Sequence, residues 1–74
     1  MTKLPRGLSG ADCVKALQKA GYWVQRQTGS HIHMKREKPK RRVSVPNHKR
    51  LKPGTLRSII RQANMSVEEF MELL

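Results

Sequence analysis

A turn that carries histidines, followed by a dense run of cations, holds the side chains best suited to chemistry. His31 and His33 follow the turn at residues 28–30, where Gly29 can adopt the positive φ of a tight reversal. Nine of the sixteen Lys and Arg residues fall at positions 35–52, with Glu37 as the only acid among them. An imidazole transfers protons near neutral pH, and neighbouring cations can hold a phosphodiester. The combination predicts a protein that cleaves or grips nucleic acid.

The composition narrows the class of protein. A formal net charge of +11 on 74 residues implies a polyanionic partner, either nucleic acid or a strongly acidic protein. The length predicts a single domain over residues 1–74 with a thin core. No run of about 18 apolar residues is present, so no membrane span is expected. The first residues lack the apolar stretch of a signal peptide.

The single cysteine, Cys13, excludes an internal disulfide and a zinc site built from several cysteines. It falls on the apolar side of a predicted helix, which favours buried filler over a reactive thiol. A reducing cytoplasm is therefore the expected location, and no cofactor is expected.

Hydrophobic periodicity predicts an α/β domain of the α+β kind, in the order helix, three strands, helix, short helix. After a lead-in at residues 1–8, a helix at 10–20 opens with Ser9 and Asp12 as a capping box and stops at Gly21. Strands are predicted at 22–27, 30–36 and 42–45, with a polar loop at 37–41. A helix begins at Pro53, and a final helix opens with a second capping box at residues 66–69. Tight connections imply a small three-stranded antiparallel sheet, with the helices on one face.

Strand alternation separates the two histidines from the core. Ile32 and Met34 are expected to face the helices, which leaves His31, His33 and Lys35 on the free face. The aromatic pair at positions 22 and 23 is suited to stacking on RNA bases. In so small a core, we expect at least one of the two to pack inside.

Several segments together resemble the HicA family of toxins, which are small RNA-cleaving enzymes of bacterial toxin–antitoxin pairs. The matching segments are Gly21-Tyr22, Arg26-Gln27-Thr28-Gly29-Ser30-His31, Val45-Pro46-Asn47-His48, the run from Gly54 to Ala63, and Glu69-Phe70. They occur in the family's order over nearly the whole chain. The resemblance implies a fold similar to the double-stranded-RNA-binding domain and an endoribonuclease (mRNA interferase) that cuts mRNA. It also implies His31 as the catalytic residue and a HicB-type antitoxin that masks the site.

The residues allow a metal-independent mechanism in which the ribose 2′-hydroxyl attacks its own phosphate. His31 would then act as the general acid or base. The residues expected to bind RNA are Gly29, Ser30, Arg26, Lys35, Arg42, Lys40, Arg41 and Lys49. The last three also offer contacts to the carboxylates of an antitoxin.

Other interpretations stay open at this point. His31 and His33 share a strand face, but two ligands do not make a metal site, and none is expected. His33 is interpreted as a solvated polar side chain, and His48 as either a loop cap or an RNA contact. The alternative to an enzyme is a non-catalytic basic module that binds RNA.

Overall fold

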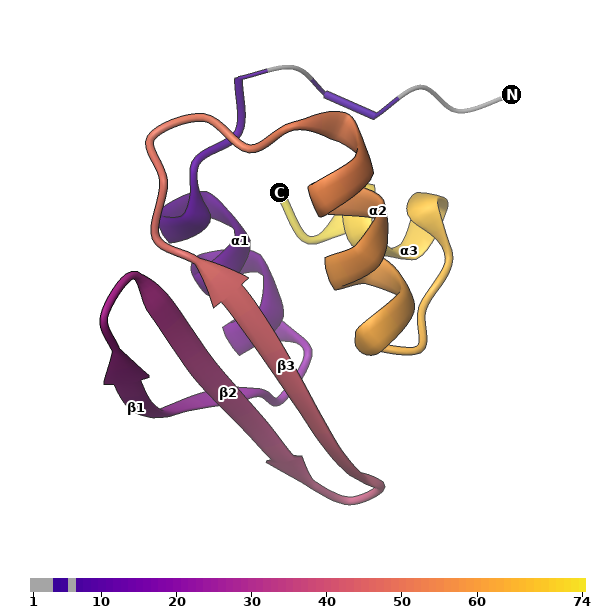
Figure 1. Ribbon diagram of the computed structural model, residues 1–74. Coiled ribbons are helices and arrows are strands. Elements are labelled where there is room, and N and C mark those ends of the chain that lie inside the picture. Colours follow the sequence, from indigo (N-terminus) through magenta and orange to yellow (C-terminus); the bar gives the residue numbers. More distant parts are fainter. Residues whose placement is uncertain (1–3, 6) are drawn as a thin grey trace.

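The computed structural model describes residues 4, 5 and 7–74, so positions 1–3 and 6 of the expected lead-in lie outside the described residues. In this described part of the chain, three strands form one antiparallel sheet in the order β1-β2-β3, accompanied by three helices (Figure 1). The elements are α1 (Gly10–Lys19), β1 (Trp23–Thr28), β2 (His31–Glu37), β3 (Lys40–Pro46), α2 (Pro53–Gln62) and α3 (Val67–Glu72). The predicted α+β class and order of elements are confirmed.

Both predicted capping boxes form. The Ser9 hydroxyl accepts the Asp12 N–H at 3.0 Å, and the Asp12 carboxylate accepts the Ser9 N–H at 3.0 Å. The backbone hydrogen bond from Ser9 is the largest of the causes that lower the pKa of Asp12. Ser66 and Glu69 repeat this arrangement at the start of α3. Gly21, at φ +94°, provides the predicted left-handed stop after α1.

The predicted loop at 37–41 is wrong. Lys38 and Pro39 alone reverse the chain, and Lys40 is already paired with Glu37 across the β2–β3 ladder. β3 therefore begins two residues earlier than the predicted strand and includes Lys40 and Arg41. Pro39 is tolerated at the tip of the hairpin because a residue there does not donate a ladder hydrogen bond. The opposite charges of Lys40 and Glu37 favour strand pairing up to that tip.

The core lies between the sheet and the helices. Its buried side chains are Cys13, Ala16, Leu17, Tyr22, Ile32, Met34, Val43, Val45, Leu51, Leu56, Ile59, Ile60, Ala63 and Phe70. In Figure 1, α1 lies behind the sheet, α2 runs beside β3, and α3 lies next to α2. Alternation along β2 and β3 directs the buried side chains toward the helices, so none of the described helices covers the opposite face.

The two neighbouring aromatic residues have opposite environments. Tyr22 is buried, and its hydroxyl donates to the carbonyl of Ala63 at 3.1 Å. Trp23 is 43% exposed and, paired with Lys35, lies on the open face. The expectation that at least one of them packs is confirmed. Within residues 4–5 and 7–74, no helix has the length and apolarity needed to cross a membrane.

Candidate functional site

His31 lies at one end of the open face as the first residue of β2. It is exposed, and it is flanked by Thr28 on β1 and Pro46 on β3. The reversal before it uses Gly29 at φ +57°, a left-handed conformation that glycine adopts without steric cost. The turn at Gly29 therefore determines the position of the His31 imidazole at the start of β2, where the ring is accessible to solvent.

Two backbone hydrogen bonds secure the surroundings of His31. The Asn47 N–H donates to the Ser30 carbonyl at 2.6 Å, which ties the end of β3 to the turn. The Gly10 N–H donates to the His48 carbonyl at 2.9 Å, which ties the next loop to α1. His48 thus contributes a structural contact through its backbone, while its side chain is exposed.

A groove of about 390 Å³ extends from His31 to α2. The sheet contributes His31, Ser44 and Pro46, and α2 contributes Gly54, Thr55, Ser58, Ile59 and Gln62. α2 begins without a side-chain cap at Lys52, so the N–H groups of Gly54 and Thr55 have no side-chain acceptor at that position. The uncapped N-terminus of a helix carries partial positive charge and favours anions. An imidazole and an anion-attracting helix end therefore share one groove.

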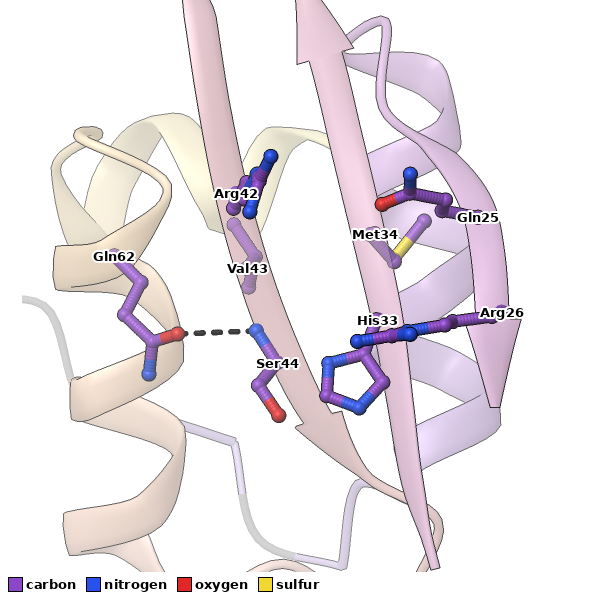
Figure 2. A pocket seen from close by; sticks show the side chains of 8 residues that line it. All are labelled: Gln25, Arg26, His33, Met34, Arg42, Val43, Ser44 and Gln62. Atoms are coloured by element: carbon purple, nitrogen blue, oxygen red, sulfur yellow. Dashed lines mark hydrogen bonds between the residues drawn. The ribbon is translucent and has the colours of Figure 1, made fainter. Parts of the chain in front are cut away.

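A second, smaller hollow of about 160 Å³ lies farther along the same face (Figure 2). Its charged or titratable lining residues are Arg26 from β1, His33 from β2 and Arg42 from β3. Ser44 and Gln62 line both hollows. The two histidines thus occupy adjoining sites along one strand.

The structure separates the other residues predicted to bind RNA. Gly29 and Ser30 form the turn beside His31, whereas Lys35 pairs with Glu37 at 3.6 Å farther along β2.

The remaining basic residues lie apart from both hollows. Lys40 lies at the far hairpin, and Arg41 is directed toward α2, where its Nε donates to the Gln62 carbonyl at 3.1 Å. Lys49 is exposed in the connection from β3 to α2. Arg41, which was predicted in the loop at 37–41, thus has a structural contact that the sequence did not indicate.

Of the residues that line this groove, only His31 was predicted as a site residue. The residues not predicted are Gly54, Thr55, Ser58, Ile59 and Gln62 on α2, and Ser44 and Pro46 on β3. One signal for the first two was present, because Pro53 starts the helix while Lys52 offers no good cap. No pattern in the sequence indicates that Gln62 contacts Ser44. Among the described residues, no group of three or more His, Cys, Asp or Glu side chains is arranged to hold a metal ion.

Comparison with known protein families identifies a match. The family model described as the HicA toxin of bacterial toxin–antitoxin systems matches residues 10–65, from the start of α1 to just past α2. This range includes His31, both hollows and all three strands. Among curated proteins, no sequence matches the chain.

Proposed function

Since the chain belongs to the HicA toxin family, and so is the toxin of a toxin–antitoxin pair, we propose that it is an endoribonuclease that cuts mRNA. Toxins of this family are generally ribonucleases. In this proposal His31 is the catalytic residue, and cleavage of transcripts in the cytoplasm inhibits translation. The observation that carries the proposal is the exposed imidazole of His31 at the mouth of a groove with an anion-attracting helix end.

The chemistry needs only one nucleophile, and the RNA supplies it. The ribose 2′-oxygen attacks the adjacent phosphorus as its proton leaves, and the bond from phosphorus to the 5′-oxygen breaks. The products are a cyclic phosphate and an RNA end with a free 5′-hydroxyl. The imidazole of His31 accepts the 2′ proton or donates one to the departing 5′-oxygen. Proton transfer by one positioned group accelerates such a step by about 10²–10⁴-fold.

Charge around the groove supports the same reaction. The transition state gathers negative charge on the phosphate oxygens, and donors aimed at that charge stabilise it. The first turn of α2 lies across the groove from His31, where a phosphate would contact its N–H groups. The net charge of +11 attracts RNA from a distance. This attraction weakens as salt is added.

The antitoxin is proposed to be a HicB-type protein that covers His31. Carboxylates on such a partner would find exposed ammonium groups at Lys40 and Lys49, neither of which forms an ion pair with a described residue. Arg41 is less available, because its Nε already donates to α2. Disruption of the complex by moderate salt would support this electrostatic contact, and a complex stable in molar salt would contradict it.

The test of the enzyme is a cleavage assay with long single-stranded RNA and a chelator in place of divalent metal. The wild-type protein is expected to shorten the RNA, whereas His31→Ala should be slowed at least a hundredfold. His48→Ala is the matched control, since it removes an exposed imidazole outside the groove.

An all-deoxy oligonucleotide of the same sequence should stay intact, because it lacks the 2′-hydroxyl, and its cleavage would contradict the mechanism. If the protein shifts the mobility of RNA without shortening it, the non-catalytic RNA-binding module replaces the enzyme.

A further inference from the structure

The open face of the sheet presents its side chains in rows that cross the three strands. One row is Thr28–His31–Pro46, and the next is Arg26–His33–Ser44. Residues two apart on a strand are separated by about 7 Å. This spacing is comparable with the distance between consecutive phosphates of an extended RNA strand. An RNA strand that has one phosphate bound at His31 therefore places a neighbouring phosphate at the row of His33.

The hollow at this second row is positively charged. Figure 2 shows the Arg26 side chain extending from β1 toward the His33 ring, with Arg42 on β3 at the same hollow. Among the described residues that line it, none is acidic. Its volume of about 160 Å³ exceeds the roughly 30 Å³ that one water occupies in the liquid several-fold, so a phosphate group fits.

The arginines of the sheet divide into two kinds. Arg36 donates to the Pro39 carbonyl and lies over the Tyr22 ring, and Arg41 donates to the Gln62 carbonyl. In contrast, neither Arg26 nor Arg42 has a side-chain hydrogen bond or ion pair with a described residue. The two arginines without a structural contact are the two at the hollow. The planar guanidinium group of an arginine can donate several hydrogen bonds at once to the oxygens of a phosphate.

We infer that Arg26, His33 and Arg42 form a subsite for a phosphate group of single-stranded RNA, one nucleotide away from the phosphate at His31. This inference rests on the proposed function for the identity of the ligand. His33 is a binding residue here and takes no part in proton transfer to the reacting atoms. The subsite sets the path of the substrate, which runs along β2 across the open face.

One consequence is a minimal substrate with more than one phosphate. A dinucleoside with a single phosphodiester would occupy only the site at His31. Addition of a terminal phosphate on the correct side would fill the subsite as well and raise kcat/KM about tenfold or more. The same addition should have no effect on a variant that lacks Arg26 and Arg42.

Binding is tested directly with inorganic phosphate as the probe, followed by NMR of the histidine ring protons. The His33 signal should shift with a saturable dependence on phosphate in the wild type and in His31→Ala. The double variant Arg26→Ala/Arg42→Ala should need at least tenfold more phosphate for the same shift. The double variant Lys15→Ala/Lys19→Ala loses the same charge on α1, behind the sheet, and should behave like the wild type.

The outcomes distinguish the inference from the proposed function. If phosphate shifts His33 through the arginines while no RNA is cut, the subsite stands and the ribonuclease fails. If RNA is cut but phosphate leaves the His33 signal unchanged, the subsite is wrong. An equal response in both double variants also overturns it, because general charge would then explain the shift. Arg26 and Arg42 are exposed, so their replacement should preserve the fold, and the single changes Arg26→Gln and Arg42→Gln provide a milder test.

Discussion

Ser44 donates its backbone N–H to the side-chain oxygen of Gln62 at 3.0 Å, which ties the outer edge of β3 to α2. Within residues 4–5 and 7–74, β3 has no further strand on that side, so a helix side chain supplies the partner that a neighbouring strand would otherwise provide. The amide nitrogen of Gln62 donates in turn to Ser58 at 3.3 Å. The contact sets the distance between the sheet, which carries His31, and α2, which forms the opposite wall of the groove.

Replacement of Gln62 with alanine should therefore weaken both the fold and the site. Loss of the acceptor leaves a part-buried N–H of Ser44 without a partner, which costs about 1–3 kcal/mol of unfolding free energy. Denaturant unfolding measures this loss. Gln62→Glu keeps an acceptor oxygen and should retain most of the stability.

If the groove depends on this contact, Gln62→Ala should also lower kcat for RNA cleavage more than it changes KM. Equal stability of the alanine and glutamate variants would show that the contact contributes nothing measurable.

Local signals in the sequence predicted the elements well, because they depend on neighbouring residues. Ser9 with Asp12, Gly21 and Pro53 each determine a helix boundary through contacts within a few positions. Strand alternation likewise placed His31 on the face opposite Ile32.

The relations across long sequence separations were not predictable in the same way. A loop and almost the whole of α2 separate Ser44 from Gln62 along the chain, and only tertiary packing brings the two residues together. Arg41 was predicted in the loop at 37–41, so the sequence did not reveal that it lies on β3 and has a backbone partner on α2. The sequence thus indicated His31 as a site residue, whereas the groove around it required the three-dimensional arrangement.

Mutations of Tyr22 and Trp23 should affect stability to different extents. Tyr22→Phe removes a buried hydrogen bond to Ala63 and should cost about 1 kcal/mol of stability. Trp23 is 43% exposed, so Trp23→Ala should change stability much less. On the open face, its indole is placed to stack on a base, and stacking contributes about 1–3 kcal/mol per base.

Binding of single-stranded RNA to the inactive His31→Ala protein measures the effect at position 23. We expect Trp23→Ala to weaken binding about fivefold or more and Trp23→Phe to weaken it less. Since Trp23 is the only tryptophan, its fluorescence should also change when RNA binds. Unchanged affinity and fluorescence would place the RNA elsewhere.

Gly10 should tolerate no side chain. A Cβ at this position would collide with the carbonyl oxygen of Pro46 and approach the Asn47 backbone. Because backbone atoms cannot move aside as a flexible side chain can, Gly10→Ala should cost about 1–3 kcal/mol. The displaced Pro46 is the ladder partner of His31, so RNA cleavage should fall as well.

Gly54 provides the matched control for this substitution. A Cβ there meets nothing within 4 Å, and alanine favours a helix over glycine by about 0.5–1 kcal/mol. Gly54→Ala should therefore keep or raise the melting temperature, whereas Gly10→Ala lowers it. A similar melting temperature for the two variants would contradict the close approach of α1 to the end of β3.

Cys13 should make stability depend on pH in the alkaline range. Burial, with a smaller contribution from Asp12, raises the pKa of its thiol from 9.0 to about 11. The unfolded chain loses this proton near pH 9, whereas the folded protein keeps it until about pH 11. The stabilising contribution is therefore complete below pH 9 and is lost as the pH rises toward 11.

Denaturant unfolding at pH 7.5 and pH 10 should show a larger loss of stability in the wild type than in Cys13→Ala. All other side chains are the same in the two proteins, so the difference isolates the thiol. Equal losses would mean that Cys13 ionises alike in the folded and unfolded states.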